Sequence, residues 1–190
     1  MNIANNETLK SIVNRRSVRH YREDQLTDEE VKIIVRAGIY APSAYNKQEW
    51  FFTVVQNPVV LKNLNDAAKQ VASTSSDPKL VELATNDQYN IFYNAPTVVI
   101  VSGKKNGLTP IIDSALASQN MMLAAQSMNI ASCWVGIVTL LFDSIVGEDY
   151  RQILNIPAAY SPHHAISFGY ADNPNLEPPR RNFQVINFIK

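Results

Sequence analysis

The positions of apolar residues predict a chain of alternating helices and strands. The clearest helical pattern runs through residues 26–43, where apolar side chains recur every three or four positions. Thr27, with Glu30 three residues later, is a capping-box sequence at the start of this helix, and Pro42 ends it. Similar patterns predict further helices over 6–15, 59–73, 80–95, 109–129 and 141–156.

Four short runs rich in aromatic and β-branched residues predict buried strands, over 49–57, 96–103, 130–138 and 163–171. More than one helix can separate consecutive strands, so the order of elements favours an α+β or α/β layered fold with a mixed sheet. The chain has 190 residues, and we therefore expect a single domain over 1–190.

The end of the chain joins a proline-rich segment, 172–181, to an apolar, strand-like tail, 183–189. An exposed apolar strand at a terminus promotes aggregation unless another element covers it or pairs with it. Pairing with a second subunit is one way to cover this tail.

Composition narrows the class of protein. The 17 Lys+Arg residues balance the 17 Asp+Glu residues, which argues against a general nucleic-acid or membrane-surface binder. Cys133 is the only cysteine, which fits a reducing compartment. The first residues lack the pattern of a signal peptide, and no apolar stretch approaches the ~20 residues of a membrane helix. We therefore expect a cytoplasmic protein.

Four cations, Arg15, Arg16, Arg19 and His20, lie within six residues of this neutral chain. They could form a solvated face or complement the negative end of a helix dipole. They could also bind a phosphate, because the guanidinium fork matches phosphate oxygens and Ser17 adds a hydroxyl donor. In an extended chain, Arg15, Ser17 and Arg19 would face one side and Arg16 the other.

The stretch 41–50, APSAYNKQEW, is the second unusual segment. Its Pro, Ser and Asn are ordinary turn residues. Asn46 and Gln48 are also amides that both donate and accept hydrogen bonds, which suits the edge of a heterocycle.

Gly136 interrupts the apolar strand SCWVGIV, either as a bulge or to let a flat ligand approach the backbone, with the N–H of Val135 or Gly136 available. Cys133 has no predicted catalytic partner and is expected to be a buried free cysteine. The three histidines have no metal-ligand pattern, and we predict no metal site. Arg180 and Arg181 lie either in a solvated loop or, if the tail folds back, beside the first arginine cluster. No dinucleotide fingerprint or P-loop is present.

In this order, RRSVRHY, APSAYNKQEW, DSALASQNMMLAAQSMNIASCWVG and GYADNPNLEPPRR resemble the nitroreductase family of FMN-dependent oxidoreductases over nearly the whole chain. The resemblance implies an α+β, three-layer fold with a mixed, mainly antiparallel central sheet flanked by helices. It also implies a homodimer with FMN at the subunit interface and a C-terminal strand exchanged with the partner subunit.

Carried onto matching positions, the resemblance implies three groups of FMN-binding residues. Phosphate and ribityl contacts would come from the arginine segment, with Arg180 closing over the phosphate and Arg181 in support. Ring contacts would come from the other subunit's 42–48 loop and from backbone N–H groups. The full set is Arg15, Arg16, Ser17, Arg19, Pro42, Ser43, Asn46, Gln48, Val135, Gly136, Arg180 and Arg181. Glu49 stands where the family usually has Pro, and Pro178 where many members have Lys.

The activity implied is NADH- or NADPH-dependent reduction of nitroaromatics, quinones or related electrophiles by a ping-pong mechanism, with no catalytic side chain assigned. An FMN-binding carrier or sensor without turnover would share the same contacts and is the alternative. A nucleic-acid contact at the arginine cluster is a third hypothesis, which the zero net charge disfavours.

Overall fold

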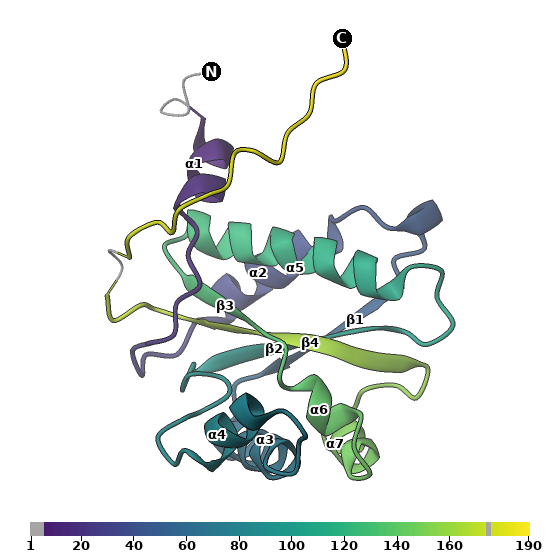
Figure 1. The fold of residues 1–190 in the computed structure, drawn as a ribbon. Helices are drawn as coiled ribbons and strands as arrows, with labels where there is room; N and C mark the ends of the chain where they lie inside the picture. The colour runs from purple at the N-terminus through teal and green to yellow at the C-terminus, as the bar shows by residue number, and fades with distance from the viewer. Residues whose placement is uncertain (1–5, 174–175) are drawn as a thin grey trace.

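The structure is a computed structural model that describes residues 6–173 and 176–190 (Figure 1). A four-stranded antiparallel sheet lies at its centre, in the order β1-β2-β4-β3. The strands are β1 (Trp50–Val55), β2 (Thr97–Lys104), β3 (Ala131–Val135) and β4 (Tyr160–Gly169). All neighbouring strands pair antiparallel, and outside them Ser17 forms an isolated parallel bridge to Ser132 beside β3. The predicted α+β fold with a mainly antiparallel central sheet is confirmed.

Helices cover both faces of the sheet (Figure 1). One face carries α2 (Asp28–Ile39) and α5 (Pro110–Ser127), and α1 (Glu7–Asn14) contacts α5. The other face carries α3 (Pro58–Ala72), α4 (Pro78–Thr85), α6 (Thr139–Phe142) and α7 (Gly147–Ile153). A short 3-10 helix, η2 (Ala44–Asn46), follows α2. This arrangement has the three layers that were expected.

Each face of the sheet has its own apolar core. Toward α3 and α6, fully buried side chains include Leu64, Ile100 and Leu141. Toward α2 and α5, they include Ile34 and Met121. Burial of each such side chain contributes about 1.5–3 kcal/mol to folding. The two cores hold the sheet between the two layers of helices. The candidate site residues lie in segments next to the ends of the strands.

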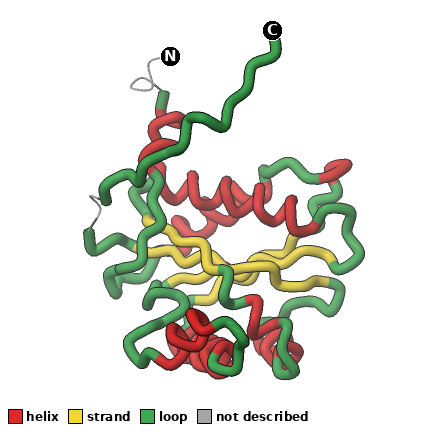
Figure 2. Tube along the Cα trace, viewed as in Figure 1, coloured by secondary structure: helices red, strands yellow, loops and turns green. Residues whose placement is uncertain are grey.

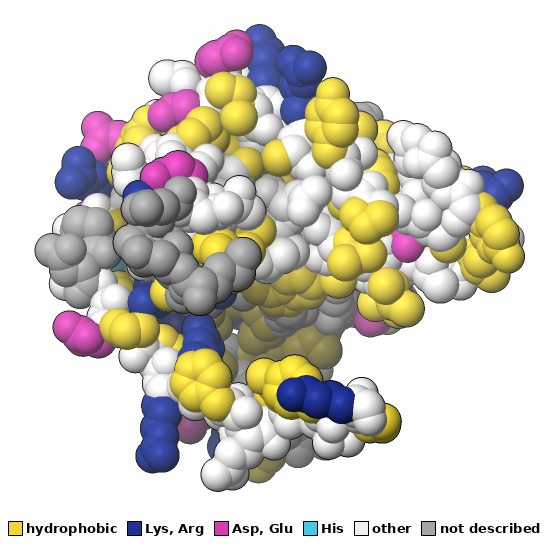
Figure 3. Space-filling view, turned by 90° about the horizontal axis from the view of Figure 1, so that it is seen from above, with side chains coloured by type: hydrophobic (Ala, Val, Ile, Leu, Met, Phe, Trp, Pro, Cys, Tyr) yellow, Lys and Arg dark blue, Asp and Glu magenta, His cyan; other side chains and the backbone are white. Residues whose placement is uncertain are grey.

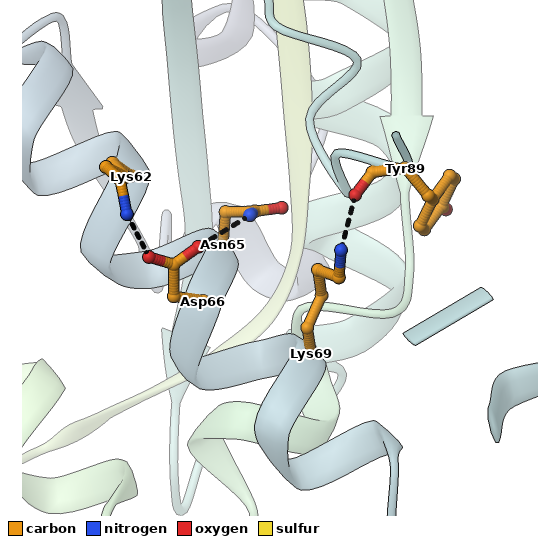
Figure 4. Close-up of polar contacts among 5 residues, drawn as sticks. All are labelled: Lys62, Asn65, Asp66, Lys69 and Tyr89. Carbon is orange, nitrogen blue, oxygen red and sulfur yellow. Dashed lines mark hydrogen bonds and ion pairs between the residues drawn. The ribbon is translucent and has the colours of Figure 1, made fainter. Parts of the chain in front are cut away.

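The prediction of a helix over 80–95 is wrong beyond Thr85. Residues 86–95 form turns, and side chains of α3 replace the missing helical hydrogen bonds. Asn65 Oδ1 accepts from the Ile91 N–H at 2.9 Å. Lys69 Nζ donates to the Tyr89 carbonyl at 3.0 Å, as Figure 4 shows. Tertiary contacts with α3 therefore override the local helical pattern.

The single helix predicted over 141–156 is divided into α6 and α7. The chain turns tightly between them, so that a Cβ atom at Gly147 would lie 2.3 Å from the carbonyl oxygen of Phe142. Only glycine allows this approach without a shift of the backbone.

The tail 183–189 forms no strand within one chain, and Figure 2 shows it as a loop that runs away from the sheet. Its pairing with a partner subunit stays a prediction. Among the described residues, no helix is both long and apolar enough to cross a membrane.

The capping box at the start of α2 is also tied to the end of β4. The Thr27 hydroxyl accepts from the Glu30 N–H at 3.3 Å, and Glu30 Oε2 accepts from the Thr27 N–H at 2.8 Å. The Tyr170 hydroxyl donates to the same carboxylate, at 2.8 Å from Oε1. The cap therefore joins α2 to the strand on which it packs.

We expect Thr27→Ala to lower the free energy of unfolding by about 1 kcal/mol, because it leaves an N-terminal N–H of α2 without its acceptor. Urea denaturation measures the change. Thr74→Ala is the matched control, since Thr74 is exposed and its hydroxyl only donates to the Val71 carbonyl. Equal losses of unfolding free energy in the two variants would contradict a specific contribution of the cap at Thr27.

Candidate functional site

The arginine segment lines an open cavity of about 410 Å³ at the end of α1. The predicted residues Arg15, Arg16, Ser17 and Arg19 all lie around it. The remaining lining comes from the proline-rich segment after β4, through Leu176, Glu177, Pro179 and Arg181. Residues more than 150 positions apart therefore meet at one place that carries four arginines and one carboxylate.

Arg16 faces the cavity with the others, so the expectation that it points to the opposite side is wrong. The reason is local: α1 ends at Asn14, and the Arg16 side chain folds back onto the helix end. Its Nη1 donates to the carbonyls of Val13 at 2.6 Å and Arg15 at 3.0 Å. Its Nε is buried and, among the described residues, has no hydrogen-bond partner.

The charges around this cavity repel one another. Partial burial lowers the pKa of Arg15, and the nearby Arg181 and Arg16 lower it further. Arginines that repel one another in a concave, partly buried site favour the binding of an anion.

Arg19 lies at the border of a second cavity, of about 430 Å³, which it shares with Tyr89 and Tyr93. Its guanidinium carbon lies 5.6 Å from the centre of the Tyr93 ring. Hydrogen bonding with Tyr93 raises the pKa of Arg19. Tyr93 thus holds Arg19 beside the cavity, a role that the predicted helix over 80–95 did not reveal.

Arg181, rather than Arg180, lines the arginine cavity. Arg180 is exposed in the same segment and is not among the lining residues. The Arg180 side chain therefore does not lie where it could close over a phosphate in this cavity, and its predicted role stays a prediction.

Pro42, Ser43, Asn46 and Gln48 lie together in the loop between α2 and β1. The Gln48 N–H donates to the Ser43 hydroxyl at 2.9 Å, and Gln48 Nε2 donates to Asn46 Oδ1 at 3.1 Å. Tyr45, Asn46 and Gln48 have φ angles of 50°, 53° and 52°, in a region that non-glycine residues seldom adopt. Such concentrated strain is typical of binding loops.

Two contacts fix this loop to the rest of the fold. Asp113, 3% exposed in the first turn of α5, accepts from the Ala44 N–H at 3.4 Å and from the Thr109 hydroxyl at 3.0 Å. Glu49 pairs with Lys104 at 3.0 Å. Glu49 thus anchors the loop to β2.

Val135 and Gly136 lie at the end of β3. Val135 is buried and paired with Ala165, whereas Gly136 is exposed just beyond the strand. Of the six glycines, Gly136 alone borders open space: an added Cβ would find Trp134 Nε1 nearest, at 4.0 Å. Within the described part of the chain, the Gly136 N–H has no hydrogen-bond partner. A flat ligand could approach the backbone here.

Figure 1 shows that the arginine segment and the loop 42–48 lie toward opposite ends of α5. An 18-residue helix is about 27 Å long, so a single small ligand cannot touch both. One chain therefore brings the arginine segment together with Arg181 at one place, and the residues of the loop 42–48 at another. It does not bring these two groups together.

The sequence model of the Nitroreductase family matches residues 12–170. The chain belongs to the nitroreductase family. Its fold is similar to a nitroreductase from Bacteroides fragilis NCTC 9343 solved with bound FMN, at 34% identity and a TM-score of 0.92. That alignment covers 97% of this chain and 100% of the other.

A second solved structure and a sequence relative are similar over most of this chain. An FMN-bound nitroreductase from Desulfitobacterium hafniense DCB-2 has 27% identity and a TM-score of 0.88, with coverage of 97% and 99%. The FMN reductase (NADPH) of Bacillus subtilis strain 168 is 23% identical over 185 residues, 95% of this chain and 72% of that protein.

Cys133 and the three histidines are not among the residues that line the arginine cavity. Burial raises the pKa of the Cys133 thiol, so it is poorly suited to act as a nucleophile. No three His, Cys, Asp or Glu side chains gather as a metal site in the described ranges. Burial, together with the nearby His163, lowers the pKa of His164 to about 3. His164 is therefore neutral near pH 7.

We expect inorganic phosphate to stabilise this protein more than chloride at equal ionic strength, because it neutralises the repelling arginines. An anion at ten times its Kd would add about 1.4 kcal/mol, which corresponds to a rise in Tm of roughly 3–6 °C. Arg15→Ala should remove the difference between the salts, and Arg22→Ala, outside this cavity, should keep it. A phosphate response that survives Arg15→Ala would contradict the assignment of the site.

Proposed function

We propose that this protein is an FMN-dependent oxidoreductase that takes electrons from NADH or NADPH and reduces nitroaromatics, quinones or related electrophiles. The observation that carries the proposal is the arginine cavity, with four cations and a buried Arg16 Nε that has no acceptor among the described residues. Family membership and the similarity to FMN-bound nitroreductases support the same cofactor. The FMN reductase of Bacillus subtilis, named for NADPH, supports a nicotinamide as electron donor.

The residues present fit the phosphate of FMN. Arg15, Arg16, Arg19 and Ser17 would hold it, with Arg181 closing the cavity from the other side. Arg180, which the resemblance assigns to the phosphate, could reach it only by a movement of its segment. The partial burial and mutual repulsion of these side chains are costs that a dianion would remove.

The ring would lie against Gly136, where the backbone is open and the N–H has no hydrogen-bond partner among residues 6–173 and 176–190. Val135 completes the backbone surface there. FMN, when bound, supplies the chemistry that accepts a hydride from the nicotinamide and passes electrons to the acceptor. The chain binds, orients and excludes water, and we assign no side chain a proton-transfer role.

The second half of the ring site would come from another copy of the chain. Pro42, Ser43, Asn46 and Gln48 are too far from the arginine cavity of their own chain, but a homodimer could place them over the partner's flavin. Exposed apolar side chains on α5, Ile111, Ile112 and Leu116, give such a dimer a surface to bury, and Figure 3 shows hydrophobic side chains across this side of the molecule. The apolar tail would add its strand to the partner.

Nicotinamide and electron acceptor would use the same place in turn, which gives a ping-pong order. One FMN-binding domain over 1–190, in the cytoplasm, completes the proposal. The single cysteine fits a reducing compartment.

We expect the purified protein to carry visible flavin absorbance, or to acquire it with added FMN, and to lose that absorbance when NADH or NADPH is added without oxygen. An acceptor such as a quinone should then restore it. Flavin that resists reduction would favour the carrier or sensor alternative. A protein that takes up no FMN would overturn the proposed function.

The homodimer can be tested by complementation between chains. An Arg15→Ala/Arg19→Ala chain lacks the phosphate half, and an Asn46→Ala/Gln48→Ala chain lacks the loop half. Each alone should bind little FMN. Each mixed dimer would have one intact site, so random pairing after co-expression should restore about a quarter of the wild-type sites.

FMN bound per chain after gel filtration measures the restored sites. Co-expression of two differently tagged copies of the arginine variant is the control, and it should restore none. No recovery in the mixed sample would show that both halves act within one chain.

A further inference from the structure

Trp134 is a half-exposed aromatic side chain at the end of β3, beside the open space at Gly136. Its neighbours Cys133 and Val135 are buried, and Val135 packs toward the α3 side of the sheet. Because strand residues alternate, Trp134 faces the α5 side. Trp134 is 40% exposed there, so part of the indole is open to a ligand.

The indole of Trp134 lies flat on the imidazole of His164. The ring centres are 3.6 Å apart and the planes differ by 18°. His164 is buried in β4 and leaves the indole only one open face. The stack fixes the plane of the indole and therefore the direction of its N–H.

His164 is itself held by α5. Its Nε2 lies 2.6 Å from the Ser118 hydroxyl oxygen, which also lies 2.8 Å from the Ser114 carbonyl. A hydroxyl has one proton, and donation to the Ser114 carbonyl leaves its oxygen to accept from His164 Nε2–H. Because His164 is neutral, this arrangement gives the ring one tautomer and one orientation.

Trp134 Nε1 is the atom nearest to the open space at Gly136, 4.0 Å from where a Cβ would be. No hydrogen bond from this indole N–H occurs within the described residues. The Gly136 N–H likewise has no hydrogen-bond partner in the part of the chain that the structure describes. Two unused N–H donors, one from a side chain and one from the backbone, therefore border the same space.

We propose that the Trp134 indole N–H is a second hydrogen-bond donor to the flavin ring bound at Gly136, and that His164 and Ser118 are the positioning residues that aim it. This inference rests on the proposed function. The acceptor would be an electron-rich oxygen or nitrogen at the edge of the ring. Neither Ser118 nor His164 touches the ligand; both act through the plane of the indole.

FMN titration of the apo-protein, followed by flavin fluorescence and by the absorption spectrum of the bound flavin, tests the inference. Trp134→Phe keeps a ring for stacking but lacks the N–H. We expect its Kd for FMN to rise about 3- to 10-fold, as for loss of one neutral hydrogen bond. The spectrum of its bound flavin should also shift relative to wild type.

Ser118 and Ser114 give a matched pair of variants. Both are fully buried on α5. The Ser114 hydroxyl has no hydrogen-bond partner among the described residues, whereas the Ser118 hydroxyl holds His164. Ser118→Ala should shift the flavin spectrum in the same direction as Trp134→Phe, and Ser114→Ala should leave it unchanged. A merely structural role would lower Tm in these variants without moving the spectrum.

Wild-type Kd and spectrum in Trp134→Phe would overturn the inference while leaving the proposed function in place. If Trp134→Phe fails to fold, the serine pair decides: equal spectra in Ser118→Ala and Ser114→Ala would also overturn it. Failure of the wild-type protein to bind FMN would instead reject the proposed function itself.

Discussion

The packing of α5 across one face of the sheet determines where a ligand can be bound. Its inner side is buried against the sheet, and its exposed side is also apolar, through Ile111, Ile112 and Leu116. The same helix anchors the loop 42–48 through Asp113 and holds His164 through Ser118. The arginine segment lies toward its other end, so the length of α5 separates the two halves of the proposed site.

If the halves meet only between copies of the chain, cofactor binding and assembly become linked equilibria. A ligand that binds the dimer but not the monomer favours the dimer by mass action. Dilution would then release cofactor, and cofactor would resist dissociation of the subunits. The repulsion among Arg15, Arg16 and Arg181 adds to this linkage, because an occupied cavity is electrostatically more favourable than an empty one.

The strands and most helices could be predicted from the sequence, because the cap at Thr27, the break at Pro42 and the β-branched runs are local signals, whereas the three layers were implied by the family resemblance. Prediction failed where tertiary contacts replace local ones. Asn65 and Lys69 hold residues 86–95 out of a helix, and a close approach at Gly147 breaks another. In the site, Arg15, Ser17 and Arg19 could be predicted from spacing, whereas Tyr93 and the Trp134–His164 stack depend on residues brought together only by folding. Neither the Arg19–Tyr93 contact nor the Trp134–His164 stack leaves a pattern in the sequence.

Gly136 differs from the other glycines in what constrains it. At Gly147 or Gly103 a side chain would collide with the protein itself, so the fold alone requires glycine or a rearrangement. At Gly136 the protein leaves room, and folding places no demand on the residue. Selection for stability would thus not oppose a substitution of Gly136, and only selection for ligand binding would. Among descendants of this chain, the residue at position 136 would record whether the site is still in use.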